Sequence, residues 1–334
     1  MDYVLIWSAL LAFVVFAYVV LDGFDLGIGL LFPFIKEPQD KSNAMNSIAP
    51  FWDGNETWLV LGGGGLYATF PLAFAIIMPA LYTPLIIMLL ALIFRGVAFE
   101  FRWRAKTLKG KKNWDLGFSL GSLLVAFSQG IALGALVQGI QVEGRAYAGG
   151  WWDWLTPFSL TTGISLVIGY GLLGACWLIY KTEGSLQKFC QTIAIRLVIL
   201  LALMIFIISL WMIFKQEPYM KRWFTYPNYL YLSPIPLLTI ALGIYLLKSL
   251  KKGSELVPFL CSIGLFGLCY FGLCISFYPN IVPPSISIWA AASPDSSLKF
   301  LLIGALVLIP IIITYTAYSY WVFRGKVSSE DHYH

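Results

Sequence analysis

The stretch L-D-G-F-D-L-G-I-G, residues 21–29, places Asp22 and Asp25 inside a long apolar run that begins at Tyr3. Two later apolar runs carry ionisable residues in the same way, F-W-D-G-N-E-T-W at 51–58 and F-R-G-V-A-F-E at 94–100. A charged side chain in hydrocarbon costs about 3 kcal/mol on insertion scales, so it is kept where it pairs, faces a polar cavity or has a function. These three stretches therefore mark both the fold and the candidate site.

The composition places the chain in a membrane. Of its 334 residues, 59% are hydrophobic and 12% charged, and the mean hydropathy is +0.79. A soluble domain carries about a quarter charged residues. The apolar runs are continuous, which favours helices over the alternating strands of a membrane β-barrel. We predict an all-α integral membrane protein with nine spans of about 20 residues or more. The spans are expected at about 3–33, 53–72, 77–101, 115–140, 158–180, 193–214, 230–248, 256–278 and 298–322.

The basic residues predict the orientation, because Lys and Arg favour the cytoplasmic side in short loops. Of the 22 Lys and Arg residues, Arg95 lies inside a span, and most others follow odd-numbered spans, on the side of the C-terminus. The five on the opposite side are Arg145, Lys215, Lys221, Arg222 and Lys299. We therefore expect the N-terminus outside, the C-terminus in the cytoplasm and an odd number of spans.

With this orientation, four consecutive spans bring acidic residues to the cytoplasmic side. These residues are Asp22, Asp25, Asp53, Glu56, Glu100 and Asp115, accompanied by Arg95. Asp22 and Asp25 are three residues apart and share a helical face. Membrane carboxyls near a helix end often belong to proton relays. In the alternative interpretation, Arg95 neutralises one acid and water at the helix ends solvates the rest.

Small and polar residues in the spans indicate close helix packing. The glycines form three G-x-x-x-G pairs and one run: Gly23 and Gly27, Gly117 and Gly121, Gly130 and Gly134, and residues 62–65. Such pairs let helix backbones approach one another. Ser128 and Gln129 lie inside the fourth span and are interpreted as interhelical hydrogen-bond partners or as members of a polar route.

Metal-ligating residues are scarce. The two histidines, His332 and His334, lie in the terminal tail, and the five cysteines show no zinc-like spacing. Membrane haems are usually held by axial His, so the sequence excludes a His-ligated haem or copper inside this chain. It also has no P-loop for a nucleotide. We predict no metal site.

Long motifs resemble a known family. N-S-I-A-P-F-W-D-G-N-E-T-W at 46–58, F-R-G-V-A-F-E-F-R at 94–102 and the stretch at 21–29 resemble subunit II of the cytochrome bd quinol oxidases, including the cyanide-insensitive branch. The segments 278–293 and 308–321 are similar to the last helices of that family. The resemblance covers the whole chain.

The resemblance implies an architecture and a partner. It implies nine transmembrane helices in two four-helix bundles plus one peripheral helix, here a single membrane domain. The first bundle is expected at about 1–142, the second at about 155–325 and a tail at 326–334. The homologous subunit I would carry haems b and d and oxidise quinol on the outer side. The quinol pool, the lipid bilayer and a small accessory membrane subunit are further expected partners, and nucleic acid is not.

The implied reaction is the reduction of oxygen to water with cytoplasmic protons, which generates proton-motive force across the bacterial cytoplasmic membrane. In the family, the Asp of W-D-G-N belongs to a proton-uptake path, which here is Asp53. Asp25 in G-F-D matches directly, whereas the position of Glu100 is usually Asp. Some members hold a structural quinone near the Trp and Arg matched by Trp52 and Arg95. The expected proton path is thus Asp53, Asp25 and Glu100.

Two other functions stay open at this point. A secondary transporter would need a substrate site at the midplane and often has broken helices. Pro71, Pro79 and Pro84 could break one helix, but the acids cluster at one leaflet. A purely structural scaffold subunit would have the same acids without a proton role.

Overall fold

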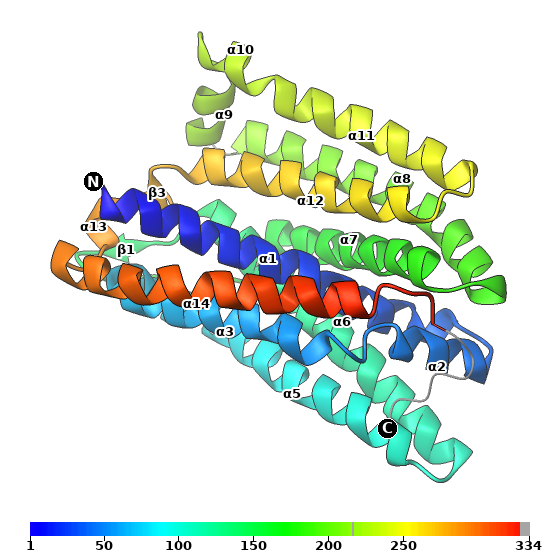
Figure 1. The fold of residues 1–334 in the computed structure, drawn as a ribbon. Helices are drawn as coiled ribbons and strands as arrows, with labels where there is room; N and C mark the ends of the chain where they lie inside the picture. The colour runs from blue at the N-terminus through cyan, green and yellow to red at the C-terminus, as the bar shows by residue number, and fades with distance from the viewer. Residues whose placement is uncertain (216, 328–334) are drawn as a thin grey trace.

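The computed structural model describes residues 1–215 and 217–327, and within them the chain is built almost entirely of helices (Figure 1). The tail histidines His332 and His334 lie outside the described residues. The α-helices are α1 (Tyr3–Leu31), α2 (Pro38–Asn46), α3 (Trp52–Thr69), α4 (Pro71–Ala80), α5 (Tyr82–Arg104), α6 (Leu108–Gln138), α7 (Pro157–Lys181), α8 (Gly184–Lys215), α9 (Glu217–Phe224), α10 (Asn228–Leu232), α11 (Pro234–Lys251), α12 (Leu256–Phe277), α13 (Ile288–Ala291) and α14 (Asp295–Val322). A 3₁₀ turn, η1 (Phe32–Phe34), extends α1, and the short strands are β1 (Val142–Glu143), β2 (Ala146–Tyr147), β3 (Asn280–Val282) and β4 (Ile286–Ser287).

The predicted all-α membrane fold is confirmed. Among the described residues, eight helical segments are long and apolar enough to cross a membrane, and they match eight of the predicted spans. The remaining prediction, 53–72, corresponds to α3, which has 18 residues but is not among the eight. Its polar D-G-N-E start and its four consecutive glycines lower its hydropathy. The count of nine spans therefore stays a prediction.

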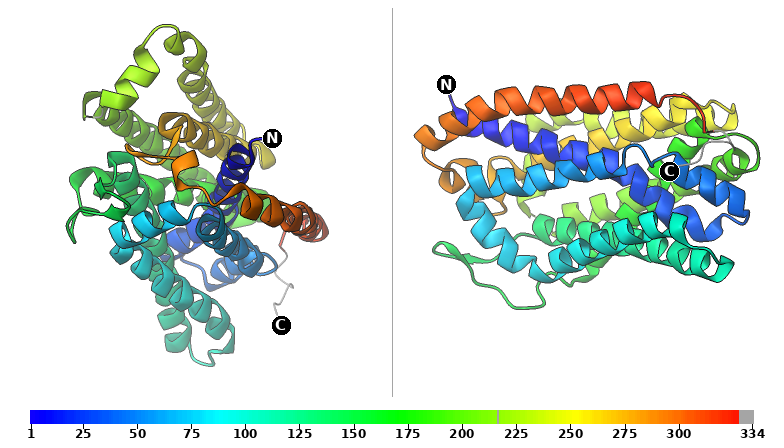
Figure 2. Two further views of the ribbon diagram at one scale, coloured as in Figure 1. Left: turned by 90° about the vertical axis from the view of Figure 1, so that its left-hand side faces the viewer. Right: turned by 60° about the horizontal axis from the view of Figure 1, so that its bottom comes forward.

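The helices form two groups of four and one outer helix. α1, α3, α5 and α6 pack together, as do α7, α8, α11 and α12, and α14 lies along the outside of α1 and α3 (Figures 1 and 2). This arrangement agrees with the two bundles and the peripheral helix that the resemblance implies. The groups share one core, in which Phe24 of α1 stacks on Trp177 of α7 with ring centroids 4.4 Å apart. The bundle boundaries at 142 and 155 stay a prediction.

Several span boundaries differ from the predicted ones for identifiable reasons. The third span begins at Tyr82 and not at 77, because the chain bends at Leu81, just after the short helix α4. Pro71 opens α4 and Pro79 lies near its end, so the proline-rich stretch does interrupt the helix, between the second and third spans. α8 begins at Gly184, well before 193, because its polar first turns continue the helix without extending the apolar run.

Glycines allow the two groups to touch through their backbones. A Cβ on Gly27 of α1 would meet the carbonyl oxygen of Tyr170 and lie 2.8 Å from the backbone nitrogen of Gly174, both on α7. Gly130 of α6 faces Gly163 of α7 in the same way, since a Cβ added to Gly130 would lie 2.6 Å from the Cα of Gly163. These contacts confirm helix packing as the role of the G-x-x-x-G pairs.

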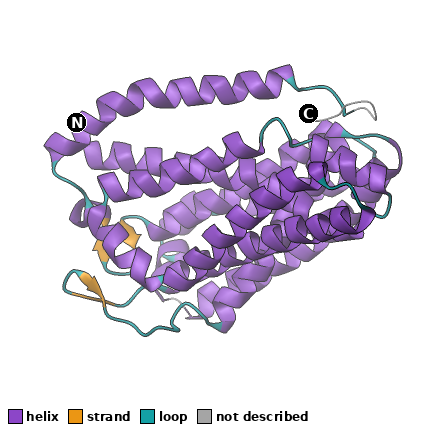
Figure 3. Ribbon diagram, turned by 90° about the horizontal axis from the view of Figure 1, so that it is seen from below, coloured by secondary structure: helices purple, strands orange, loops and turns teal. Residues whose placement is uncertain are grey.

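The two ends of the molecule are closed differently. At the end that bears the N-terminus, β1 pairs with β2 and β3 with β4 in two short antiparallel hairpins (Figure 3). At the other end, the segment after α14 is tied to α7. The Lys181 Nζ donates to the carbonyls of Phe323, at 2.5 Å, and Gly325, and the Val327 N–H donates to the Lys181 carbonyl at 2.8 Å. This tether fixes the position of α14.

Gly27→Ala is expected to destabilise the protein by about 1–3 kcal/mol, the usual effect of overpacking a tight core. The new methyl group would collide with backbone atoms of α7, which cannot move aside as a flexible side chain can. Gly243→Ala on α11 is the matched control, because its Cβ would have no atom within 4 Å. The thermal unfolding midpoint of the purified protein measures both. Equal midpoints for the two variants would contradict the proposed backbone contact.

Candidate functional site

Asp22 and Asp25 of α1 are both fully buried, and each residue has a relative solvent exposure of 0%. Their spacing of three residues places them on one face of α1, and Tyr18 lies on the same face one turn earlier. The neighbouring Gly23 lies against the ring of Tyr170 on α7, which leaves little space around this face. The first sequence stretch thus combines buried carboxyls with the closest helix packing in the core.

Arg95 of α5 pairs with the first of these carboxyls. Its Nη1 lies 2.7 Å from Asp22 Oδ1 and 3.4 Å from Glu56 Oε1, so three helices meet at one guanidinium. Arg95 is 1% exposed, whereas the Glu56 side chain is 25% exposed. One part of the alternative interpretation, that Arg95 neutralises an acid, is confirmed, and the acid is Asp22. A buried pair of this kind tolerates little change, since removing one partner leaves an uncompensated charge.

Asp25 has a different partner, Asn55 of α3. The Asn55 Nδ2 donates to Asp25 Oδ2 at 2.8 Å and to the Leu21 carbonyl at 3.2 Å, and the Tyr320 hydroxyl of α14 donates to Asn55 Oδ1 at 3.0 Å. Asn55 is 1% exposed. It therefore links α1, α3 and α14. Sequence reasoning missed Asn55, although its place between Asp53 and Glu56 in a polar helix start was a usable signal.

Four atoms of this cluster keep unused hydrogen-bonding capacity. Asp22 Oδ2, Asp25 Oδ1, Glu56 Oε1 and Arg95 Nη2 are buried and have no hydrogen-bond partner within residues 1–215 and 217–327, although Glu56 Oε1 keeps its 3.4 Å ion-pair contact with Arg95. Buried polar atoms in proteins are nearly always paired, and exceptions call for an explanation such as a catalytic role.

Asp53 and Glu100 line a pocket of about 370 Å³ beside this cluster. Asp53 is exposed in the first turn of α3, and Glu100 of α5 is partly buried. The wall that the pocket shares with the buried cluster includes Asn55 and Tyr320. The structure therefore brings Asp53 and Glu100 to one opening and places Asp25 behind it, bonded to Asn55.

The two residues expected near a quinone are placed differently from each other. Trp52 lines the same pocket, with its ring 5.3 Å from that of Phe99 and against Gly96. Arg95 does not line the pocket, because it is enclosed in its ion pairs. A structural quinone at Trp52 and Arg95 stays a prediction.

Asp115 does not join the buried cluster. It lies two turns into α6, where its Oδ1 is 2.5 Å from Arg102 Nε and its Oδ2 is 3.2 Å from Lys41 Nζ. The Arg102 guanidinium and the Lys41 ammonium also lie over the ring of Phe32. This second ion-pair network joins α2, α5 and α6 and accounts for Asp115 structurally.

Gln129 forms interhelical hydrogen bonds deeper in the core. Its Nε2 donates to the Tyr18 hydroxyl at 2.6 Å, and its Oε1 accepts from the Tyr170 hydroxyl at 2.7 Å. The interpretation of Gln129 as a satisfied partner between helices is confirmed. In the described part of the chain, no group of three or more His, Cys, Asp or Glu side chains is placed to hold a metal ion.

Comparisons with known proteins agree over the full chain. The family model of the cytochrome bd terminal oxidase subunit II matches residues 3–323. The chain is 28% identical to cytochrome bd-I ubiquinol oxidase subunit 2 of Escherichia coli K12, covering 98% of this chain and 95% of that protein. It is also 28% identical to cytochrome bd ubiquinol oxidase subunit 2 of Bacillus subtilis 168, covering 98% and 97%.

A solved structure supports the fold. A chain in the structure of bd oxidase from Geobacillus thermodenitrificans has a TM-score of 0.78 with this chain at 16% sequence identity. The match covers 97% of this chain and 99% of the other. At that identity the likeness concerns the fold alone.

Arg95→Met is expected to lower stability by roughly 3–5 kcal/mol, because it leaves Asp22 and Glu56 without their countercharge in a buried position. Adding Asp22→Asn to it should restore part of the loss by removing one of the unpaired charges. Arg104→Met, at an exposed position of the same helix, is the control. The yield and thermal midpoint of the purified protein provide the comparison. A double variant no more stable than Arg95→Met alone would argue against the pairing.

Proposed function

The chain belongs to the cytochrome bd terminal oxidase subunit II family, and from this premise we propose that it is the haem-free subunit of a bd-type quinol oxidase and contributes to proton uptake from the cytoplasm. The observation that carries the proposal is the pocket holding Asp53 and Glu100, whose wall contains the partners that lead to Asp25. The haem-free assignment rests on the sequence, since its two histidines are both in the tail.

The partner in this proposal is the homologous subunit I, which would carry haems b and d and oxidise quinol on the outer side. Reduction of oxygen to water consumes protons at a buried centre, so a path through the low-dielectric region is required. The haems would supply the redox chemistry from the partner. This chain would supply groups that take up, hold and pass protons.

Each residue of the cluster has a distinct task in such a path. Asp53 is exposed and can exchange protons with water, and Glu100 lies at the same pocket. Asn55 holds Asp25 in place, so that Asp25 Oδ1 stays available to a proton. Arg95 compensates the nearby negative charge through Asp22. Asp53, Asp25 and Glu100 are therefore the proposed proton-carrying groups, and Asn55 and Arg95 are positioning residues.

The proposed topology is nine spans in the bacterial cytoplasmic membrane, with the N-terminus outside and α3 as the ninth span. An α3 of 18 residues is about 27 Å long at 1.5 Å per residue, close to the thickness of the hydrocarbon layer. It lies among the other long helices (Figure 1), in direct contact with α1. A pure scaffold remains the competing function, and it differs only in giving the acids no proton role.

Reporter fusions test this topology. A reporter active only in the cytoplasm should be inactive when fused after residue 81, active after residue 110 and inactive after residue 145. The sign follows from the excess of Lys and Arg on one side. A fourth fusion after residue 46, between α1 and α3, should be active. Activity after both residue 46 and residue 81 would show that α3 does not cross, whereas inactivity after residue 46 with activity after residue 81 would show the opposite orientation.

Asp53→Asn is expected to lower the oxygen turnover of the purified oxidase by at least about tenfold, because the amide keeps the shape but cannot take up a proton. Asp53→Glu should retain part of the activity. Assembly and haem content should be unchanged, since Asp53 is exposed and has no ion pair among the described residues.

Glu143→Gln is the matched control, because it neutralises an exposed acid of strand β1, far from the pocket in the chain and at the other end of the fold. Oxygen consumption with excess quinol measures turnover, and the optical spectrum measures haem content. Normal turnover of Asp53→Asn at normal haem content would assign the acid to the scaffold and the relay to the partner.

A further inference from the structure

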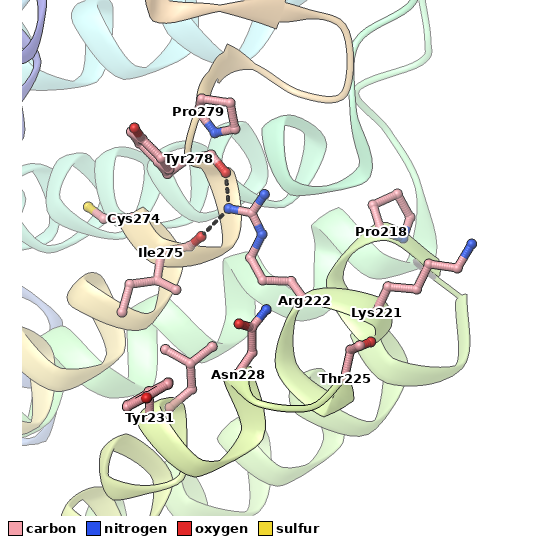
Figure 4. Close-up of a pocket in the computed structure, with 11 residues that line it drawn as sticks. Pro218, Lys221, Arg222, Thr225, Asn228, Tyr231, Cys274, Ile275, Tyr278 and Pro279 are labelled. Atoms are coloured by element: carbon pink, nitrogen blue, oxygen red, sulfur yellow. Dashed lines mark hydrogen bonds between the residues drawn. The ribbon is translucent and has the colours of Figure 1, made fainter.

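A second pocket, of about 820 Å³, lies at the end of the molecule that bears the N-terminus, between α9, α10 and the last turn of α12. Its lining includes Arg222, Asn228 and Lys221 together with Tyr231, Leu232 and Ile275. Figure 4 shows the Arg222 guanidinium between the end of α12 and the pocket interior, with the Asn228 side chain close by and Lys221 at the far rim. The proposed proton path does not use this pocket, which lies at the opposite end of the molecule from Asp53 and Glu100.

Arg222 is held rigidly but keeps donors free. Its Nη1 donates to the carbonyl of Ile275 at 2.8 Å and to that of Tyr278. A guanidinium has five N–H donors, so its Nε and Nη2 groups remain, and they have no hydrogen-bond partner in the described ranges. Next to it, Trp223 Nε1 donates to Ser276 Oγ at 2.9 Å, which fixes α9 on α12. The guanidinium is thus pre-oriented for a second acceptor.

This pocket is positively charged, although the end of the molecule on which it lies carries few basic residues. Basic residues are rare at this end, yet two of the five found there line the pocket side by side. Lys221 is 2.7 Å from Glu217 Oε1, and this hydrogen bond keeps the pKa of Glu217 below its ordinary range, so that pair is charged and balanced. Arg222 has no acidic partner in the described ranges, and no acidic residue lines the pocket. A net positive charge therefore remains for an anion.

The surroundings place this charge at the depth of lipid headgroups. Tyr226, Tyr229 and Tyr231 are exposed around α10, and exposed tyrosines typically gather at the membrane interface. Exposed apolar side chains follow on the two neighbouring helices α11 and α12. Phe271, one turn before Ile275 on α12, is 58% exposed, and Leu237 on α11 is 64% exposed. An amphipathic anion bound here could place its apolar chain along α11 and α12.

We propose that this pocket binds the phosphate group of an anionic phospholipid, with Arg222 and Asn228 donating to the phosphate oxygens and the acyl chains lying along α11 and α12. Lys221 at the rim adds long-range attraction. A free phosphate ion would use the same donors but would gain nothing from Phe271 and Leu237, which is why the proposal commits to the lipid.

Native mass spectrometry of the purified complex, titrated with phosphatidylglycerol, tests the proposal. Arg222→Gln keeps an amide that can donate to the α12 carbonyls but removes the charge, and Asn228→Leu leaves the α12 contacts untouched. Each should weaken binding of one phosphatidylglycerol molecule about tenfold, as expected for losing one hydrogen bond to a charged group. The zwitterionic phosphatidylcholine should bind the wild type more weakly.

Lys299→Gln is the matched control, because it removes a positive charge at the same end of the molecule but outside the pocket. Its phosphatidylglycerol binding should equal that of the wild type. Unchanged binding in both pocket variants, or an equal loss in Lys299→Gln, would overturn the proposal. Displacement of the lipid by an equal concentration of inorganic phosphate would also overturn it, since the pocket would then be a free-anion site.

Discussion

The ion pair between Arg95 and Asp22 is the constraint on which the rest of the first helix group depends. Both side chains are almost completely buried, and the pair spans α1 and α5 at 2.7 Å. In hydrocarbon neither charge could persist alone, so the two helices must keep a fixed distance and register. Glu56 joins the same guanidinium and thereby orients α3. Once α3 is placed, Asn55 reaches Asp25, and Asp53 falls at the opening of the neighbouring pocket.

This constraint also explains the glycines around it. A guanidinium shared by three helices requires those helices to lie close together, and a fourth helix, α6, approaches Arg95 at Gly121, whose Cβ would lie 2.9 Å from the Arg95 Cβ. On the other side of α1, Gly27 admits the backbone of α7. The small residues and the buried charges therefore depend on each other, because the tight packing that glycine allows excludes lipid from the polar cluster. The open positions Gly63 and Gly64 on α3 follow no such rule within this chain.

The membrane fold, most of the spans and the pairing of Arg95 could be predicted from the sequence. Each follows from the large free energy of transferring side chains between water and hydrocarbon. Burying an unpaired arginine is so costly that an acidic partner could be expected. The identity of that acid could not be predicted, because it depends on how α1, α3 and α5 are rotated about their axes. The link from Asn55 to Tyr320 could not be predicted, since the two residues are 265 positions apart and neither carries a charge. The pocket at Arg222 was missed because a basic residue in a connecting segment has no burial penalty to draw attention to it. The span at α3 has too low a hydropathy to be counted with the other eight because of its polar start, which carries Asp53, Asn55 and Glu56.

The position of α14 has a consequence for how the protein is made. This helix is the last of the spans to be synthesised, yet its Tyr320 stacks on Phe51 at 4.3 Å and closes the wall around Asn55. Until α14 has packed against α3 and the segment after it has bonded to Lys181 of α7, the polar cluster has an open flank. The buried carboxyls are therefore enclosed on this side by a helix that follows all the other long helices in the sequence, so every earlier span must be made before the cluster can be closed.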